Sequence, residues 1–184
     1  VSNVSTNRLY LNNGTSAPFD GAVGSDITAE VIDAAAVALG DLDSDGDLDM
    51  AVAKSGGNSL YLNNGTDDPF AGVVSAGLST DASLTTSIAL GDMDSDGDLD
   101  VVVGNFTQPN RLYLNNGTAS PFEGVAGSDI TSDTHSTRAV ALGDINGDGA
   151  LDLIVGNDGQ ANRFYLNNGT SAPFEGVVGA DISP

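Results

Sequence analysis

The sequence predicts an all-β fold, and three observations support that prediction. The chain repeats itself, because the block YLNNGT begins at Tyr10, Tyr61, Tyr113 and Tyr165, at spacings of 51, 52 and 52 residues. Short runs rich in Val, Ile and Leu and bounded by glycine recur in each repeat, which is typical of strands. No stretch of ten or more residues shows a convincing helical spacing of apolar side chains. A period of about 50 residues holding four strands is typical of a propeller blade.

The repeats predict about three and a half β-propeller-type blades of four antiparallel strands each. We expect a half blade at residues 1–32, with strands C and D near Arg8 to Thr28. Three full blades are expected at residues 33–83, 84–135 and 136–184. Residues 1–184 would then form a single repeat domain of fourteen strands, and 184 residues fit one domain.

The first full repeat gives the expected order of strands. Strand A runs from about Ala36 to Leu39, strand B from Asp49 to Ala53, and strand C from Leu60 to Leu62. Strand D is poorly marked and lies between Phe70 and Ser79. Asn63, Asn64 and Gly65 predict a tight hairpin turn after strand C, because asparagine and glycine tolerate positive φ. Strands A and B are almost continuously apolar, which predicts burial on both faces between neighbouring blades.

An aspartate-rich loop joins strands A and B in every full repeat. It reads DLDSDGDLD at 41–49, DMDSDGDLD at 92–100 and DINGDGALD at 144–152. Side-chain oxygens stand at positions 1, 3, 5 and 9, and glycine at position 6 permits a sharp turn. Calcium takes six to eight oxygen ligands, so this spacing predicts a calcium loop. Position 7 varies to Ala150, which is expected if that position binds through its backbone carbonyl. The alternative is a set of acidic surface turns without metal.

The loops begin like EF-hand loops but differ from them at the closing position. An EF-hand has a bidentate glutamate at position 12, whereas Val52, Val103 and Val155 stand there in this chain. The flanking runs also predict strands rather than helices. Each loop is therefore expected to join two strands as a metal-bound hairpin.

The pattern GDxDxDGxxD between AVALGD-like and LDLVVG-like strands, followed by NRLYLNNGT, resembles the FG-GAP/VCBS repeats over nearly the whole chain. Those repeats build calcium-bearing propellers, including the head of integrin alpha subunits and some fungal lectins. The resemblance implies three calcium sites, and adhesion or ligand binding rather than catalysis. By matching positions it implies these metal ligands: Asp41, Asp43, Asp45, Asp47, Asp49, Asp92, Asp94, Asp96, Asp98, Asp100, Asp144, Asn146, Asp148, Ala150 and Asp152. Asp47, Asp98 and Ala150 would bind through their carbonyl oxygens.

The number of blades departs from that family, whose best-known members close a complete ring. An open fan would expose strand edges and apolar faces. Two explanations stay open: the chain is part of a longer propeller, or copies associate as a homo-oligomer to close a ring.

Charge and composition exclude several classes of partner. The formal charge is −21, from 26 acidic and 5 basic residues, and 13 of the acids lie in the three loops. This charge argues against nucleic acid as a partner and against binding to anionic membrane surfaces. No apolar run is long enough for a transmembrane helix, and the chain has no cysteine for a disulfide. Calcium loops favour an extracellular or cell-surface location, where the ion is abundant.

Few residues suggest catalysis. His135 is the only histidine and has no counterpart in the other repeats, so we expect it in a solvent-facing connection. Glu123 and Glu175 follow Pro-Phe at matching places, and a hydrolytic acid pair is conceivable, but a solvated edge explains them better. Arg8, Arg111 and Arg163 recur beside a tyrosine and are candidate ligand-binding residues in grooves between blades. The alternative is that each arginine pairs with a nearby aspartate.

Together these features predict a non-catalytic, calcium-stabilised binding module for carbohydrate, similar to a lectin. A protein-adhesion module of the integrin type and a structural fragment of a larger propeller are the alternatives, and a hydrolase is a distant one.

Overall fold

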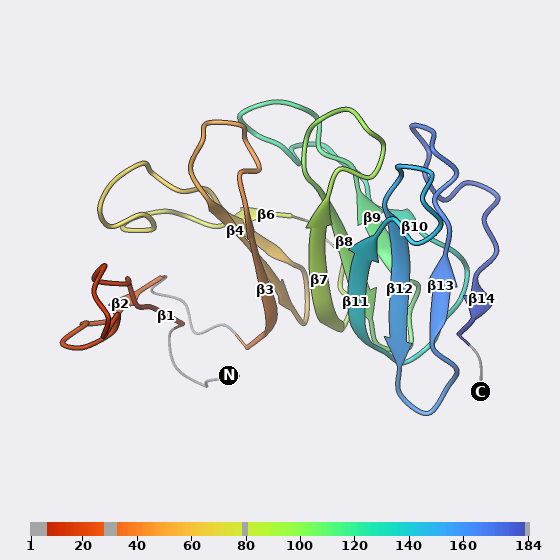
Figure 1. Ribbon diagram of the computed structural model, residues 1–184, viewed down its shortest axis with the longest axis horizontal. Helices are drawn as coiled ribbons and strands as arrows, with labels where there is room; N and C mark the ends of the chain where they lie inside the picture. Colours follow the sequence, from red (N-terminus) through yellow and green to blue (C-terminus); the bar gives the residue numbers. More distant parts are fainter. Residues whose placement is uncertain (1–6, 28–32, 79–80, 183–184) are drawn as a thin grey trace.

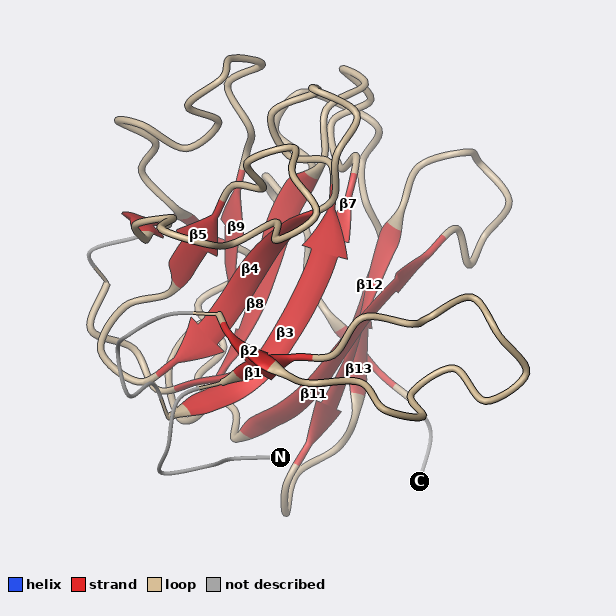
Figure 2. Ribbon diagram, turned by 90° about the vertical axis from the view of Figure 1, so that its left-hand side faces the viewer, coloured by secondary structure: helices blue, strands red, loops and turns tan. Residues whose placement is uncertain are grey.

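The computed structural model describes residues 7–27, 33–78 and 81–182 (Figure 1). Within these ranges every regular element is a β-strand, and Figure 2 shows no helix. The strands are β1 (Arg8–Leu9), β2 (Ser25–Asp26), β3 (Ala34–Gly40), β4 (Asp49–Lys54), β5 (Ser59–Tyr61), β6 (Ala76–Gly77), β7 (Thr85–Gly91), β8 (Asp100–Asn105), β9 (Arg111–Tyr113), β10 (Ser128–Asp129), β11 (Thr137–Gly143), β12 (Asp152–Asn157), β13 (Arg163–Tyr165) and β14 (Ala180–Asp181).

The strands form three four-stranded antiparallel sheets and one two-stranded sheet. Strands β3 to β6 make the first full sheet, β7 to β10 the second and β11 to β14 the third, each in sequence order. Strands β1 and β2 pair alone and correspond to strands C and D of the expected half blade. The predicted all-β fold of four-stranded blades is thereby confirmed. The exact blade boundaries stay a prediction, and Thr28 and Ser79 lie outside the described residues.

The connection between strands C and D differs from the expected hairpin. Strand β5 ends at Tyr61 and β6 covers only Ala76–Gly77, so residues 62–75 form a long loop between them. Gly65 has a φ of 68°, but neither asparagine before it adopts a positive φ. Instead, the Asn63 side chain accepts a hydrogen bond from the Gly65 N–H (2.9 Å), and Asn64 accepts one from Thr66 (3.0 Å). The prediction of a tight turn was wrong because asparagine acts here through its side chain, which shapes a loop rather than a hairpin.

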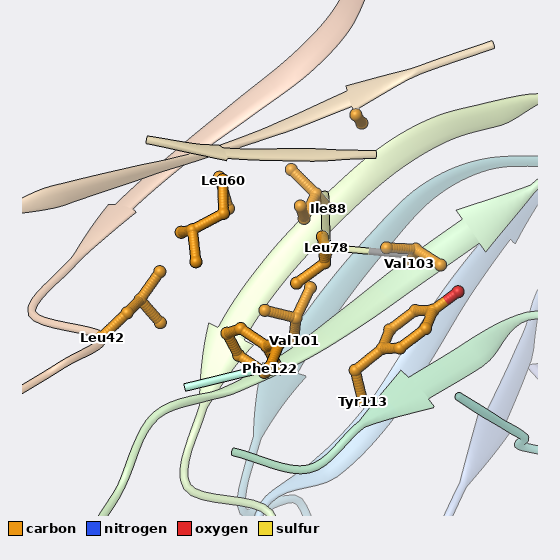
Figure 3. Close-up of a cluster of buried hydrophobic side chains, with 10 residues drawn as sticks. Leu42, Leu60, Leu78, Ile88, Val101, Val103, Tyr113 and Phe122 are labelled. Carbon is orange, nitrogen blue, oxygen red and sulfur yellow. The ribbon is translucent and has the colours of Figure 1, made fainter. Parts of the chain in front are cut away.

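Consecutive full sheets stack face to face, with β3, β7 and β11 lying side by side (Figure 1). Apolar side chains fill the space between each pair of sheets. Figure 3 shows the cluster between the first and second full sheets, where Leu42 and Leu60 meet Ile88, Val101 and Tyr113. A second cluster, which includes Met93, Val102, Leu153 and Tyr165, joins the second and third.

Burial on both faces, as predicted for strand B, is confirmed in β4 and β8. Val101 and Val103 belong to the cluster with the first full sheet, whereas Val102 belongs to the cluster with the third. At the two ends of the stack, the prediction of burial on both faces was wrong for part of β3 and part of β12. Alternate residues of β3 and Ile154 of β12 face outward, because no complete sheet covers them within the described residues.

These outward-facing residues define two end faces. The first end face consists of Val37, Leu39 and Leu48, each more than half exposed. The last end face consists of Ile145, Ile154, Leu166 and Ile182, which are 38–48% exposed. Their counterparts one repeat earlier include Met93, Val102 and Ile130, which are at most 3% exposed. The end faces are therefore ordinary inter-sheet surfaces that no complete sheet covers in the part of the chain that the structure describes.

Candidate metal sites

Three aspartates of the first A–B loop converge in space. Asp41, Asp43 and Asp49 each offer a carboxylate oxygen, and these oxygens lie within 4.8 Å of one another. Asp92, Asp94 and Asp100 form the same arrangement in the second loop. These are positions 1, 3 and 9 of the loop. The structure therefore brings together three of the five predicted ligands in each of these two loops.

The loop curls because its first aspartate binds the backbone that follows. The Asp41 carboxylate accepts hydrogen bonds from the N–H groups of Asp45 (3.1 Å) and Gly46 (3.0 Å). Gly46 has a φ of 96° and Ser44 a φ of 60°. The glycine at position 6 is therefore required by the turn, and Ser44 holds a conformation that serine rarely adopts. The second loop repeats both features at Gly97 and Ser95.

The aspartate at position 9 anchors the loop to the sheet. Asp49 is fully buried, and its Oδ2 accepts a hydrogen bond from the Leu42 N–H (2.8 Å). Its Oδ1 accepts one from the Asn63 N–H (2.8 Å), which ties the start of the loop to the residues after β5. The same two bonds hold Asp100 and Asp152 in the later repeats.

Positions 5 and 7 lie outside the three-carboxylate clusters. Asp45 accepts a hydrogen bond from the Asp47 N–H (2.9 Å), so it supports the turn. The Asp47 side chain lies against the next loop, since a Cβ added to Gly65 would be 3.1 Å from Asp47 Oδ2. Asp96 and Asp98 repeat this arrangement in the second loop. Metal binding by positions 5 and 7 stays a prediction.

The two clusters carry unrelieved negative charge, which fits a divalent cation. Asp43 Oδ1 and Asp94 Oδ1 are buried without a hydrogen-bond partner. Burial, followed by repulsion from the neighbouring carboxylates, raises the pKa of Asp43 and of Asp94. Burial raises the pKa of Asp49, and it raises the pKa of Asp100 to about 7. A hard cation with oxygen ligands would satisfy these atoms and favour their charged forms.

The third loop is weaker by the same criteria. Asp144 accepts hydrogen bonds from Gly147, Asp148 and Gly149, so the turn resembles the others. Asn146 replaces the aspartate at position 3, and its Nδ2 donates to Asp148 Oδ2 at 2.8 Å. The Ala150 N–H also donates to Asp148, whose pKa is lowered by this bond. Within the described residues no three-carboxylate cluster forms here, so a third metal site stays a prediction.

The three recurring arginines lie in ion pairs. Arg8 Nε is 3.3 Å from Asp26, Arg111 is 3.3 Å from Asp81, and Arg163 is 3.1 Å from Asp133. Each arginine also donates to a backbone carbonyl sixteen residues later, those of Gly24, Gly127 and Gly179. Tyr113 and Tyr165 donate their hydroxyl protons to Asp81 (2.6 Å) and Asp133 (2.9 Å). The geometry favours the structural alternative, and ligand binding by the arginines stays a prediction.

Hydrogen bonding between repeats was missed from the sequence. Asp81 and Asp133 stand eleven residues before their loops, so their recurrence at a spacing of 52 could have identified them. Asn115 and Asn167 belong to the YLNNGT block, which was interpreted only as a turn. Their side chains reach the preceding sheet, as described below.

A groove opens between the first and second full sheets, and the residues that line it do not belong to the aspartate loops. It comprises two hollows of about 290 and 520 Å³ that share Gly77, Phe122 and Glu123 in their walls. Leu60 and Ala76 line one hollow, and the other holds polar groups. Asp81, Arg111 and Glu123 are the charged side chains that line the groove.

The residues considered for catalysis do not form a recognisable centre. His135 is partly buried in the connection before β11, where its carbonyl accepts a hydrogen bond from Thr107. Glu123 and Glu175 are exposed and lie on equivalent loops of two different sheets. No helix within the described ranges is long and apolar enough to cross a membrane.

The fold and the loops define a class: a repeat protein of propeller-type blades with an acidic turn between the first two strands of each full blade. The FG-GAP-like repeat family matches residues 41–103 and again 92–155, so the chain belongs to that family. The predicted resemblance is confirmed. The matched segments run from one A–B loop to strand B of the next repeat.

Similar curated proteins share one name. Cartilage acidic protein 1 of Mus musculus is 32% identical over 120 residues, which is 61% of this chain and 18% of that protein. The Homo sapiens protein is 31% identical over the same shares, and the Xenopus tropicalis protein is 33% identical over 85 residues, 46% of this chain and 13% of its own length. The chain spans less than a fifth of the length of these relatives.

Proposed function

We propose that this protein is a non-catalytic binding module whose blades are stabilised by calcium. The paired three-carboxylate clusters at equivalent loops support this proposal most directly. Each contains a buried oxygen without a hydrogen-bond partner, and such an atom is costly unless a cation or donor satisfies it. Asp41, Asp43 and Asp49 would hold one ion, and Asp92, Asp94 and Asp100 a second. Asp144 and Asp152 would contribute to a third, weaker site.

The chain's own residues prepare these sites before any ion binds. Backbone N–H groups already hold the carboxylates at positions 1 and 9, so little reorganisation is needed on binding. Calcium, when bound, supplies the positive charge that the clustered aspartates lack. Three such ions would reduce the formal charge from −21 to −15. An extracellular or cell-surface location suits such a protein, because calcium is abundant there.

Removal of calcium tests the stabilising role. We expect excess chelator to lower the melting temperature sharply, because the ion binds the folded loops far better than the unfolded chain. Differential scanning calorimetry with and without added calcium measures the shift, and magnesium serves as the control cation. An unchanged melting temperature in chelator would contradict structural calcium.

We further propose that the groove between the first and second full sheets binds carbohydrate. Its wall combines the apolar surface of Leu60 and Phe122 with the charged groups of Arg111, Glu123 and Asp81. Such a mixture of apolar floor and a few polar groups is typical of small-ligand sites. Hydroxyl-rich sugars can meet both kinds of surface.

Binding to a glycan array tests this site, with Glu123→Ala as the variant. Glu123 is exposed and lines both hollows, so its loss should weaken sugar binding without unfolding the blade. Asp67→Ala is the matched control, because it removes one negative charge from the C–D loop of the first full sheet, outside the groove lining. Equal binding by both variants would count against the groove. Retention of a protein partner in place of glycans would favour an adhesion module instead.

A further inference from the structure

The first asparagine of the YLNNGT block connects two aspartate loops in the later repeats. The Asn115 N–H donates to Asp100 Oδ1 (2.8 Å), which belongs to the second loop. Its Nδ2 donates to the carbonyl of Leu42 (2.8 Å), which belongs to the first loop, and to that of Leu99 (3.1 Å). The side chain is therefore shared between two sheets.

Asn167 repeats this arrangement one blade later. Its N–H donates to Asp152 Oδ1 at 2.8 Å, and its Nδ2 donates to the carbonyls of Met93 (2.7 Å) and Leu151 (3.0 Å). Asn115 and Asn167 are 7% and 4% exposed, so water competes little for these bonds. A continuous chain of hydrogen bonds thus runs from the first loop through the second to the third.

The residue that receives the bond sits between two candidate metal ligands. Leu42 stands between Asp41 and Asp43, and its N–H donates to Asp49 (2.8 Å). Its side chain is 1% exposed in the core between the sheets. Three interactions therefore fix Leu42, the residue between positions 1 and 3. Its N–H donates to Asp49, its carbonyl accepts from Asn115, and its side chain packs in the core. Met93 is held in the same way by Asp100, Asn167 and the second core cluster.

The first full repeat provides a natural comparison. Asn63 makes the equivalent bonds within its own sheet, to Asp49 through its N–H and to the Leu48 carbonyl (3.1 Å) through its Nδ2. Within the described residues no aspartate loop precedes it, and it has no bond to a neighbouring sheet. Ile145, the counterpart of Leu42 in the third loop, is 48% exposed and lies on the last end face.

We propose that Asn115 and Asn167 couple the metal loops, so that calcium binding at one loop raises the affinity of the adjacent loop. An ion bound by Asp41, Asp43 and Asp49 fixes the Leu42 peptide, which positions Asn115 and through it Asp100. An ion bound by the second loop acts in the reverse direction, because coupling between two binding sites is reciprocal. This inference rests on the proposed calcium binding and assigns the two asparagines a positioning role.

Calorimetric titration with calcium chloride tests the first link in an Asp144→Ala background, which impairs the third loop and leaves two sites. The parent should bind its second ion more tightly than two independent sites would, by about fivefold, the effect of one hydrogen bond of typical net strength. Asn115→Ala should abolish this cooperativity. Asn63→Ala removes the equivalent Nδ2 bond within its own sheet, to Leu48, but no bond between sheets, so it should retain the cooperativity.

The ratio of the two stepwise constants separates coupling from a merely structural effect, which would weaken both sites and leave the ratio unchanged. Equal ratios in the Asn115→Ala and Asn63→Ala proteins would overturn the coupling while leaving calcium binding intact. A parent that binds no calcium would overturn the proposed function as well. If Asn115→Ala fails to fold, Asn167→Ala in an Asp41→Ala background tests the second link, where the same loss of cooperativity between the second and third loops is expected. Retained cooperativity there would overturn the inference.

Discussion

Asp100 shows how one residue can reveal what its site requires. Its carboxylate is buried at the base of the second loop and accepts two backbone hydrogen bonds, yet burial dominates and raises its pKa to about 7. In the calcium-free protein this aspartate therefore binds a proton more readily when folded than when unfolded. Without a metal, folding therefore disfavours the charged form of Asp100, and a bound cation would stabilise that form.

This shift predicts an unusual pH dependence for the calcium-free protein. Between pH 4 and pH 7 the folded Asp100 holds more protons than the unfolded one, so the free energy of unfolding falls as pH rises through that window. The raised pKa values of Asp43, Asp49 and Asp94 act in the same direction. The lowered pKa of Asp133 acts in the opposite direction, but mostly below pH 4.

Thermal melts of metal-stripped protein at pH 5 and pH 8 check this expectation. The melting temperature should be lower at pH 8, by roughly 3 °C or more, given the usual dependence of melting temperature on stability for a chain of this size. Asp100→Asn should reduce the difference, and saturating calcium should reverse it, because the bound ion favours the charged carboxylates. A calcium-free melting temperature that rises from pH 5 to pH 8 would show that burial does not raise the pKa values of these aspartates.

At the scale of the loop, the three A–B turns share one backbone shape but differ in their side chains. The first two bring three carboxylates within 4.8 Å, whereas the third has Asn146 at position 3. In addition, Leu42 and Met93 are buried beneath the next sheet, but Ile145 is exposed. The third loop therefore has less negative charge, and no neighbouring sheet within the described residues packs over its second residue.

Calcium affinities should follow this order. Calorimetric titration of Asp41→Ala should show the loss of a strong site, whereas Asp144→Ala should remove only a weak one. Restoring a carboxylate with Asn146→Asp should strengthen the third site. Gly149→Ala should weaken the third site, since Gly149 has a φ of 93°, a conformation that alanine rarely adopts. A third loop that binds calcium as tightly as the first would mean that neither the number of carboxylates nor packing beneath the next sheet controls the affinity.

At the scale of the strand, the sequence was a good guide where each residue contributes to a repeated pattern. Continuous apolar runs predicted β4 and β8, because burial on both faces leaves a clear signal. Strand β6 covers only Ala76–Gly77, and two residues cannot display any periodicity. The loop clusters were predictable at positions 1, 3 and 9. The roles of Asp45 and Asp47 within the turn were not, because a carboxylate can bind an ion or a backbone N–H equally well.

The partners of the recurring asparagines could not be predicted from the sequence, for a physical reason. Asn115 and Leu42 are 73 residues apart, and their bond depends on how two sheets stack. The repeat spacing shows that an asparagine recurs, but not whether its side chain turns into its own loop or toward a neighbour. The groove beside Phe122 depends on the same stacking.

Within the described residues, the molecule is a stack of sheets with exposed apolar side chains at each end. The last end face repeats, position by position, the surface that the second full sheet presents to the third, where Val102 and Ile130 are at most 3% exposed. Apolar surfaces of this kind favour association when no further sheet covers them. The high negative charge opposes association, and calcium would reduce that charge.

We therefore expect the isolated 184-residue chain to self-associate, and more strongly with calcium than without it. Ile154→Lys on the last end face and Leu39→Lys on the first should each reduce the mass measured by light scattering, because a buried lysine at such a contact is costly. Val178→Lys is the matched control, since Val178 is 86% exposed in the loop before β14 and belongs to neither end face. A monomeric mass at high concentration with calcium present, or an equal effect of all three lysines, would show that the end faces do not drive association.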